Sequence, residues 1–179
     1  MPEYYFDTEA TGFDFDKDEI ITIQWQRLNG FTGEPIGELT MLKRWESSEE
    51  EIIKTFIPNL KCRPFDFIFV GKNLLFDFSL LNQRMKHYNL GEIDLRCLHE
   101  RVSLDIKPIL VMMNNGNFTG YDKVLPKTNP LTNYQIPQLF REGEYPEIVQ
   151  YVKDETNDFI KAYRTLKKEM PRLAKLISK

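Results

Sequence analysis

The feature that most constrains this chain is an apolar stretch close to its start, residues 4–12, into which two acids are set. Because side chains i and i+2 of a strand lie on the same face, an extended backbone places Asp7 and Glu9 side by side. Two neighbouring carboxylates repel each other and are costly to desolvate unless a cation or hydrogen-bond donors lie between them. An oxygen-ligated metal ion is the functional interpretation. The alternative, which is more common for an isolated Asp-x-Glu, is a strand that ends at its solvated tip.

The composition predicts one domain, residues 1–179, with a full core, because 41% of the residues are apolar and 13% are aromatic. The sequence has no uninterrupted apolar run of about 18 residues, the length of a membrane span. The first expected strand begins at residue 4, which leaves no room for a signal peptide. We therefore expect a cytoplasmic protein with no membrane partner. Cys62 and Cys97, with two histidines, give no zinc spacing, so a metal must take carboxylates.

The net charge of −3 is unevenly distributed, and the distribution bears on binding partners more than the sum does. Residues 161–179 hold seven Lys or Arg and one Glu, whereas the rest of the chain is acidic. A helical tail with a basic face would be able to contact phosphates. The alternative is an ordinary solvated helix surface, which is equally common. The residues of the basic face are Lys161, Arg164, Lys167, Lys168, Arg172 and Lys175.

Hydrophobic periodicity predicts the strands of an α/β fold. The first three form an antiparallel meander, because turn-rich segments separate them closely. The fourth is short, almost wholly apolar and closed by Gly71, which is typical of a buried parallel strand after a crossover helix. The expected strands are residues 4–9, 21–26, 38–45, 65–70 and 102–106.

Capping signals and apolar spacing predict the helices. Ser47 and Ser48 each have a Glu three residues later, the capping-box pattern that opens a first helix, and Pro58 should end or kink it. Residues 114–133 are rich in Gly, Asn, Thr and Pro, so we expect an irregular segment that faces a substrate. Further helices are expected from Asp77, over residues 108–113, and from Tyr145.

Two further acids stand where function is expected. Asp77 lies at or near the start of the helix that leaves the carboxyl end of the fourth strand, where ligands bind in open α/β sheets. Glu155 interrupts the apolar stripe of the last helix and, at about 100° per residue, falls within about 20° of its centre. Asp158 falls toward the edge of that stripe and Asp154 well off it. Tyr151, one turn earlier on the same side, would on its own be an ordinary core aromatic with its hydroxyl at the rim.

The combined pattern is Asp7 and Glu9 on a first strand, Asn73, Phe76 and Asp77 after a fourth, and Tyr151 and Glu155 on a last helix. It resembles the DEDD superfamily of 3′-to-5′ exonucleases, specifically the tyrosine branch that includes the exonuclease domains of family B DNA polymerases. The resemblance extends over residues 4–166. It implies a ribonuclease H-like fold, with a central mixed sheet of three antiparallel strands plus parallel strands, flanked by helices.

The resemblance also implies phosphodiester hydrolysis by two Mg²⁺ or Mn²⁺ ions, which prefer hard oxygen ligands. Asp7 would bridge both ions, while Glu9 and Glu155 would hold the ion that activates water. Asp77 would help to hold the other ion, directly or through a water. Tyr151 would orient the attacking water, because a phenol with a pKa near 10 is a poor base. The family usually has Asp at the position of Glu155, and the added methylene would shift a ligated metal.

The implied substrates are the 3′ ends of single-stranded DNA or RNA, with DNA favoured, and the products are nucleoside 5′-monophosphates. Substrate contacts fall to Ala10, Thr11, Asn73 and Phe76, the last two as guides or stacking partners of the terminal base. Ala10 stands where many members of the family have Thr, which leaves that contact to backbone groups or to Thr11. A DNA polymerase or a repair complex is the implied protein partner.

Two other interpretations stay open. In the first, the chain is a nucleic-acid-binding or polymerase-accessory module of the same fold. Glu155, in place of the usual Asp, then prevents binding of the second metal ion. In the second, the chain is an ordinary α/β domain with unrelated acids, and Glu155 is then paired with a core Lys or Arg. Titration with Mn²⁺ separates the first of these from an active exonuclease.

Overall fold

The chain folds around a five-stranded mixed sheet with the strand order β3-β2-β1-β4-β5. The computed structural model describes residues 1–60, 67–94, 103–125 and 127–178. β2 pairs antiparallel with both β1 and β3, whereas β4 runs parallel to both β1 and β5. This confirms the predicted sheet of three antiparallel strands extended by parallel ones. The strands are β1 (Glu3–Ala10), β2 (Ile20–Leu28), β3 (Thr40–Lys43), β4 (Ile68–Gly71) and β5 (Ser103–Asp105).

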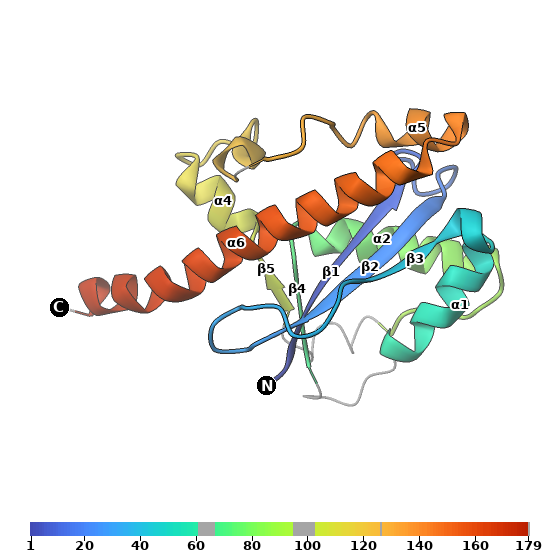
Figure 1. Ribbon diagram of the computed structural model, residues 1–179. Coiled ribbons are helices and arrows are strands. Elements are labelled where there is room, and N and C mark those ends of the chain that lie inside the picture. Colours follow the sequence, from blue (N-terminus) through green and yellow to red (C-terminus); the bar gives the residue numbers. More distant parts are fainter. Residues whose placement is uncertain (61–66, 95–102, 126, 179) are drawn as a thin grey trace.

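Helices cover both faces of the sheet (Figure 1). α1 and α2 pack on one face, and the long α6 crosses the other face and projects beyond the body at its C-terminal end. This layering is the ribonuclease H-like architecture that the sequence predicted. The helices of the described residues are α1 (Glu49–Leu60), α2 (Leu74–His87), α4 (Lys107–Met113), α5 (Ile136–Glu142) and α6 (Tyr145–Ile177), with 3₁₀ turns η1 (Arg44–Glu46) and η2 (Tyr121–Val124).

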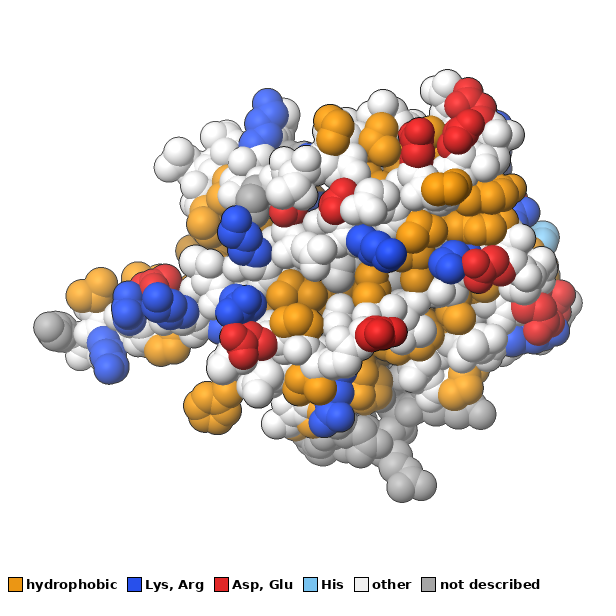
Figure 2. All heavy atoms as spheres, in the orientation of Figure 1, with side chains coloured by type: hydrophobic (Ala, Val, Ile, Leu, Met, Phe, Trp, Pro, Cys, Tyr) orange, Lys and Arg blue, Asp and Glu red, His pale blue; other side chains and the backbone are white. Residues whose placement is uncertain are grey.

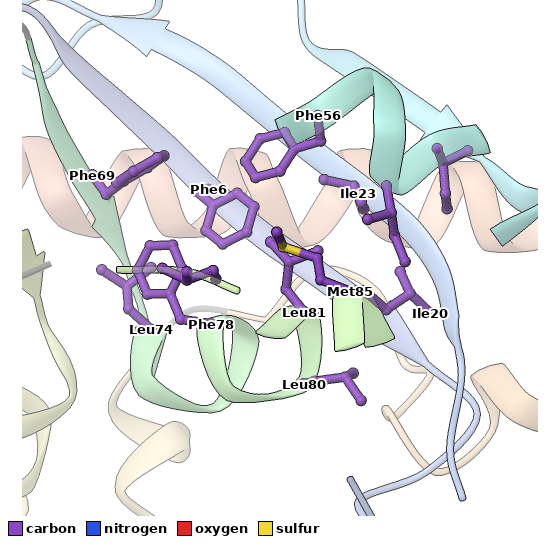
Figure 3. Packing of buried hydrophobic residues seen from close by; sticks show 13 residues of the cluster. Phe6, Ile20, Ile23, Phe56, Phe69, Leu74, Phe78, Leu80, Leu81 and Met85 are labelled. Carbon is purple, nitrogen blue, oxygen red and sulfur yellow. The ribbon is translucent and has the colours of Figure 1, made fainter. Parts of the chain in front are cut away.

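β1 lies at the centre of the sheet and divides its side chains between the two helical layers, because successive residues of a strand point to opposite faces. Phe6 is fully buried between Phe56 of α1 and Phe78 of α2, at ring-centroid distances of 4.9 and 5.2 Å (Figure 3). Tyr5 packs on the opposite face against α6. Asp7 and Glu9 have the parity of Tyr5, so they face α6 as well.

A buried ion pair joins α1 to α2. Glu49, in the first turn of α1, and Arg84 of α2 are 2% and 4% exposed. The Glu49 carboxylate accepts hydrogen bonds from Arg84 Nε and Nη2, from the Tyr88 hydroxyl and from the backbone N–H of Ile20, all between 2.6 and 2.8 Å. The carboxylate is therefore well supplied with donors although water does not reach it. No sequence pattern predicted this pair.

The predicted first helix forms, but Pro58 does not end it at once. Ser48 Oγ accepts the backbone N–H of Glu51 at 3.2 Å, as the capping pattern predicted. α1 contains Pro58 and continues to Leu60. A proline so close to the C-terminus removes a single intrahelical hydrogen bond, and this explains why the last turn survives.

Other elements differ from expectation mainly at their ends. The strand predicted at residues 38–45 is shorter, because its last part winds into η1. The strands predicted at residues 65–70 and 102–106 begin partly outside the described residues. The described residues of the segment 114–133 are irregular apart from η2, as predicted. α5 was not predicted; its signals are Pro137 at the start and Gly143, with φ 78°, just past the end.

No helix within the described ranges is both long and apolar enough to span a membrane. Cys62 and Cys97 lie outside those ranges.

Candidate functional site

Three carboxylates from two elements converge between the sheet and α6. Asp7 and Glu9 come from β1 and Glu155 from α6, and each offers one oxygen within 4.8 Å of the other two. Strand alternation puts Asp7 and Glu9 on the face that α6 crosses. Helix periodicity placed Glu155 on the inward side of α6, and the structure brings it to these two acids.

Burial and mutual repulsion make this group of carboxylates unfavourable when it is fully ionised. Burial, followed by the charge of Glu155, raises the pKa of Asp7 to about 7. The same two causes, with Asp7 adding to them, hold the pKa of Glu9 well above its usual range. A cation among the three carboxylates would remove this repulsion and lower both pKa values.

The hydrogen bonds around the three carboxylates are incomplete. Gln24 Nε2 of β2 donates to Asp7 Oδ2 at 2.9 Å, and Lys72 Nζ lies 3.1 Å from Glu155 Oε1. Within the described part of the chain, Glu155 Oε2 is the buried side-chain oxygen that has no hydrogen-bond partner. Buried polar atoms are rarely left unpaired in folded proteins. A group of hard carboxylate oxygens with one unpaired fits Mg²⁺ or Mn²⁺.

The ion pair of Lys72 bears on the interpretation of the chain as an ordinary α/β domain. That interpretation required Glu155 to be paired with a core Lys or Arg, and Lys72 supplies the pair, with both side chains 24% exposed. One ammonium does not neutralise three carboxylates, however. The pKa values of Asp7 and Glu9 stay raised although Lys72 acts to lower them. The pair therefore leaves much of the repulsion in place.

Asp77 lies in the first turn of α2 and is 3% exposed. Its Oδ1 accepts hydrogen bonds from the backbone N–H and the hydroxyl of Thr8, at 3.0 and 2.7 Å. Burial, followed by the charge of Asp7, holds its pKa well above the usual range. Asp77 is thus bonded to β1 and stands apart from the group of three carboxylates. All four acids nevertheless line one cavity of about 390 Å³.

Tyr151 is 1% exposed and lies one turn before Glu155 on α6. Its hydroxyl donates to Asn133 Oδ1 at 2.7 Å. Burial, followed by the charges of Glu9 and Glu155, raises the pKa of Tyr151 far above its usual range, so the phenol keeps its proton at neutral pH. Sequence reasoning missed Asn133, which closes the irregular segment and carries no signal of its own.

Two other acids of α6 bind the irregular segment instead of joining the three carboxylates. Asp158, expected at the edge of the apolar stripe, is 7% exposed and accepts hydrogen bonds from the backbone N–H and hydroxyl of Thr128 at 2.7 and 3.0 Å. Asp154 accepts one from Asn129 Nδ2 at 2.9 Å. Asp158 is more buried than its place at the edge of the apolar stripe predicted, because residues 127–129 fold over this side of the helix.

An aromatic rim surrounds the outer part of the cavity. Phe76, the predicted stacking residue, has its ring centroid 5.8 Å from that of Phe13 and 5.3 Å from that of Phe15. The Phe13 ring also lies 5.5 Å from Tyr134, and these two side chains are 57% and 79% exposed. Sequence reasoning missed Phe13, Phe15 and Tyr134 as site residues, although two exposed aromatics in an acidic loop are unusual enough to be a signal.

The remaining predicted substrate residues line the cleft with their polar groups engaged. Ala10 and Thr11 lie beside the aromatic rim. Thr11 Oγ1 donates to Asp18 at 2.9 Å, which holds the loop after β1. Asn73 has a left-handed backbone, with φ 67°, and its Oδ1 accepts a hydrogen bond from Lys107 at 2.7 Å. The Asn73 side chain thus lies at the cavity but is already bonded within the protein.

The basic tail is only partly available for phosphates. Lys167 donates to Glu3 Oε1 at 2.6 Å and also to the carbonyl of Gly30, so it stabilises the fold instead of projecting into solvent. Arg164 and Arg172 are ion-paired with glutamates. Figure 2 shows Lys and Arg side chains gathered on the projecting end of α6. The exposed lysines of the tail in the described residues are Lys161, Lys168 and Lys175.

Comparison with known proteins shows a shared fold without a close relative. No protein-family model matches the chain, and no curated protein sequence matches it. A structure of exonuclease I, described in connection with processivity, matches with a TM-score of 0.63 at 13% identity. Exonuclease I from Methylocaldum szegediense matches with a TM-score of 0.58 at 14% identity. The zinc-bound complex of E. coli exonuclease I with single-stranded DNA matches with a TM-score of 0.62 at 13% identity.

These matches cover nearly all of this chain but less than half of exonuclease I. They cover 96%, 96% and 98% of this chain and 42%, 41% and 42% of the other chains, in the order given above. Identity this low shows the fold alone. The chain therefore shares the fold of part of exonuclease I, and the matches do not distinguish the tyrosine branch or a polymerase-like exonuclease.

Proposed function

We propose that residues 1–179 form a single metal-dependent 3′-to-5′ exonuclease domain that hydrolyses single-stranded nucleic acid, DNA in preference to RNA, to nucleoside 5′-monophosphates. The observation that carries this proposal is the convergence of Asp7, Glu9 and Glu155, where one buried oxygen of Glu155 has no hydrogen-bond partner among the described residues. The fold shared with exonuclease I, which has been seen with zinc and single-stranded DNA, supports it.

The four acids of the cavity would have different roles in binding the metal ions. Two bound Mg²⁺ or Mn²⁺ ions would supply a hydroxide near neutral pH and stabilise charge on the attacking and leaving oxygens. Asp7, Glu9 and Glu155 would hold these ions, and Asp77 would assist from the same cavity. Because Tyr151 keeps its proton, it would orient the attacking water as a hydrogen-bond partner and would not act as the general base.

The aromatic rim would select single strands. Phe13, Phe76 and Tyr134 present rings beside the backbone of Ala10 and Thr11, where a terminal nucleotide would have to lie to reach the acids. Base-on-aromatic stacking contributes about 1–3 kcal/mol per base and requires that the base face be free. The faces of bases stacked in a duplex are already covered, so a single strand fits this rim better.

Finer assignments follow from individual residues. Tyr151 one turn before Glu155 favours the tyrosine branch, and with it a resemblance to the exonuclease domains of family B DNA polymerases. A DNA polymerase or repair complex as partner is a prediction of the same resemblance. A cytoplasmic location stays a prediction from the sequence.

Cleavage of a 5′-labelled single strand tests the proposal. In Mg²⁺ or Mn²⁺ the protein should shorten the strand from its 3′ end and release mononucleotides. Asp7→Ala should abolish cleavage, because it removes the ligand proposed to bridge both ions. Asp154→Asn, which changes an acid of the same helix outside the group of three carboxylates, is the control and should cleave normally. Wild-type turnover by Asp7→Ala would contradict the proposal.

A second candidate, a binding module with a weakened metal site, is favoured by one observation. Lys72 engages an oxygen of Glu155, so a metal-free ion pair already satisfies part of the site. Calorimetric titration with Mn²⁺ separates the candidates. Two bound ions with release of mononucleotides support the exonuclease, whereas one ion or none, with strand binding retained, supports the binding module.

A further inference from the structure

Lys72 occupies an unusual place beside the group of three carboxylates. It lies in the short link between β4 and α2, next to Asn73, whose left-handed backbone starts α2. Its ammonium is 3.1 Å from Glu155 Oε1. Lys72 therefore reaches from the carboxyl end of β4 across the cavity to α6, where Asp7, Tyr151 and Glu155 line the same pocket.

The ammonium and a metal ion compete for the same carboxylate. Glu155 has one oxygen on Lys72, and the other has no hydrogen-bond partner in the part of the chain that the structure describes. The carboxylate also lies within reach of Asp7 and Glu9. A divalent cation bound by these three residues would lie close to the ammonium, and two cations repel strongly where little water screens them. Either Lys72 then leaves Glu155, or the metal binds without Glu155 as a ligand.

We propose that Lys72 is a built-in competitor of the metal: its ammonium holds Glu155 in the metal-free protein, and metal binding displaces it from that carboxylate. This inference rests on the proposed function in that it requires a divalent ion at Asp7, Glu9 and Glu155. Lys72 stabilises the metal-free protein and lowers metal affinity. The site consequently fills only when enough divalent ion is present to displace the lysine.

The test compares Mn²⁺ binding and metal-free melting of the wild type with those of Lys72→Met, which keeps the length of the side chain and removes its charge. Lys72→Met should bind Mn²⁺ about tenfold more tightly, within the range of coupling between two sites on one protein. The metal-free variant should also melt at a lower temperature, because three carboxylates lose their nearby cation. Lys72→Gln provides a second neutral variant and should behave in the same way.

The matched control is Lys127→Met. Lys127 lines the same cavity, with its ammonium 5.9 Å from the centre of the Tyr151 ring. The substitution Lys127→Met removes one positive charge from the cavity and leaves the ion pair of Lys72 with Glu155 unchanged. Its Mn²⁺ affinity should change far less than that of Lys72→Met. An equal change in both variants would mean that the total charge of the cavity, and not the contact with Glu155, sets the affinity, and would overturn the proposal.

The other outcomes separate this inference from the proposed function. If the wild type binds Mn²⁺ and Lys72→Met binds it equally or more weakly, the competition is wrong while the metal site stands. If that variant instead shows a raised KM for single strands at unchanged Mn²⁺ affinity, Lys72 contacts a phosphate of the substrate and is no competitor. If neither the wild type nor the variant binds Mn²⁺, the proposed function and this inference both fall.

Discussion

Glu49 and the group of three carboxylates lie on opposite faces of the same sheet, and their need for hydrogen-bond donors is met to different degrees. On the face covered by α1 and α2, Glu49 is paired with Arg84 and accepts hydrogen bonds from four donor atoms. On the face covered by α6, Asp7 accepts a hydrogen bond from Gln24 and Glu155 is paired with Lys72, but within the described residues one buried oxygen of Glu155 has no hydrogen-bond partner. The incomplete hydrogen bonding of this group is what the proposed cation would complete.

The difference predicts which substitutions damage the fold and which damage the chemistry. The Glu49 carboxylate is fully bonded, and the other carboxylate near Arg84 among the described residues is the partly exposed Glu19 at 3.7 Å, so losing Glu49 leaves Arg84 poorly paired in the core. The carboxylates on the α6 face repel one another, so neutralising one of them costs the fold little or nothing. Stability and activity should therefore respond to different acids.

The largest effect is expected on cleavage from Glu155→Gln. Loss of one charged ligand should reduce cleavage by several orders of magnitude, because it weakens binding of the metal ion that activates the attacking water. Glu155→Asp should keep activity in Mn²⁺ and lose more of it in Mg²⁺, whose geometric demands are stricter. Single-turnover assays in each metal measure both variants. The melting temperature of Glu155→Gln should stay within a few degrees of the wild type; extensive unfolding would instead make Glu155 a structural residue.

The next effect is expected on stability from Glu49→Gln. Removing the charge that faces Arg84 should lower the free energy of unfolding by about 3–5 kcal/mol, as measured by urea denaturation. Arg84→Met combined with Glu49→Gln should restore part of the loss, because no buried charge is then left unpaired. Cleavage at a temperature where Glu49→Gln is folded should be close to normal. A loss of cleavage without a loss of stability would connect Glu49 to the chemistry and remove the contrast between the two faces.

The contrast also shows what sequence patterns are able to predict. Strand parity paired Asp7 with Glu9, and helix periodicity turned Glu155 inward, because both depend only on local geometry. Lys72, Gln24 and the Glu49 pair were missed, since each depends on a contact between elements far apart in the sequence. The periodicity of apolar residues along the sequence carries no information about such contacts.

Loops were the least predictable part of the site. The irregular character of residues 114–133 follows from their composition, but composition does not say where the loop returns to the fold. Two hydrogen bonds, between the Tyr151 hydroxyl and Asn133 and between Thr128 and Asp158, depend on how this segment folds over α6. They were therefore not predictable from composition. Short helix α5 was likewise missed, because its apolar face covers too few turns to give a period.

A smaller effect is expected on strand binding from the aromatic rim. Phe13→Ala and Tyr134→Ala should each weaken single-strand binding by about 1–3 kcal/mol, the contribution of one stacked base. Fluorescence titration of a labelled oligonucleotide measures this change. Phe31→Ala is the matched control, since Phe31 is 95% exposed and lines a different pocket. Equal losses in all three variants would mean that the rim has no special role.

The smallest effect is expected from the tail of α6. Lys168→Gln and Lys175→Gln should each lower the slope of log affinity against log salt by about one unit if the lysine contacts a phosphate. Lys167→Gln should leave the slope unchanged and lower stability instead, because Lys167 is bonded to Glu3 and Gly30. An unchanged slope for Lys168→Gln and Lys175→Gln would make the tail an ordinary solvated helix.

The most direct test of the cation site is a crystal of the protein soaked in Mn²⁺, with anomalous scattering recorded at the manganese edge. A metal site predicts an anomalous peak bounded by Asp7, Glu9 and Glu155, with the Glu155 Oε2 atom now coordinated. No peak at this position in a fully soaked crystal, with Lys72 still paired to Glu155, would contradict the claim that these carboxylates form a metal site.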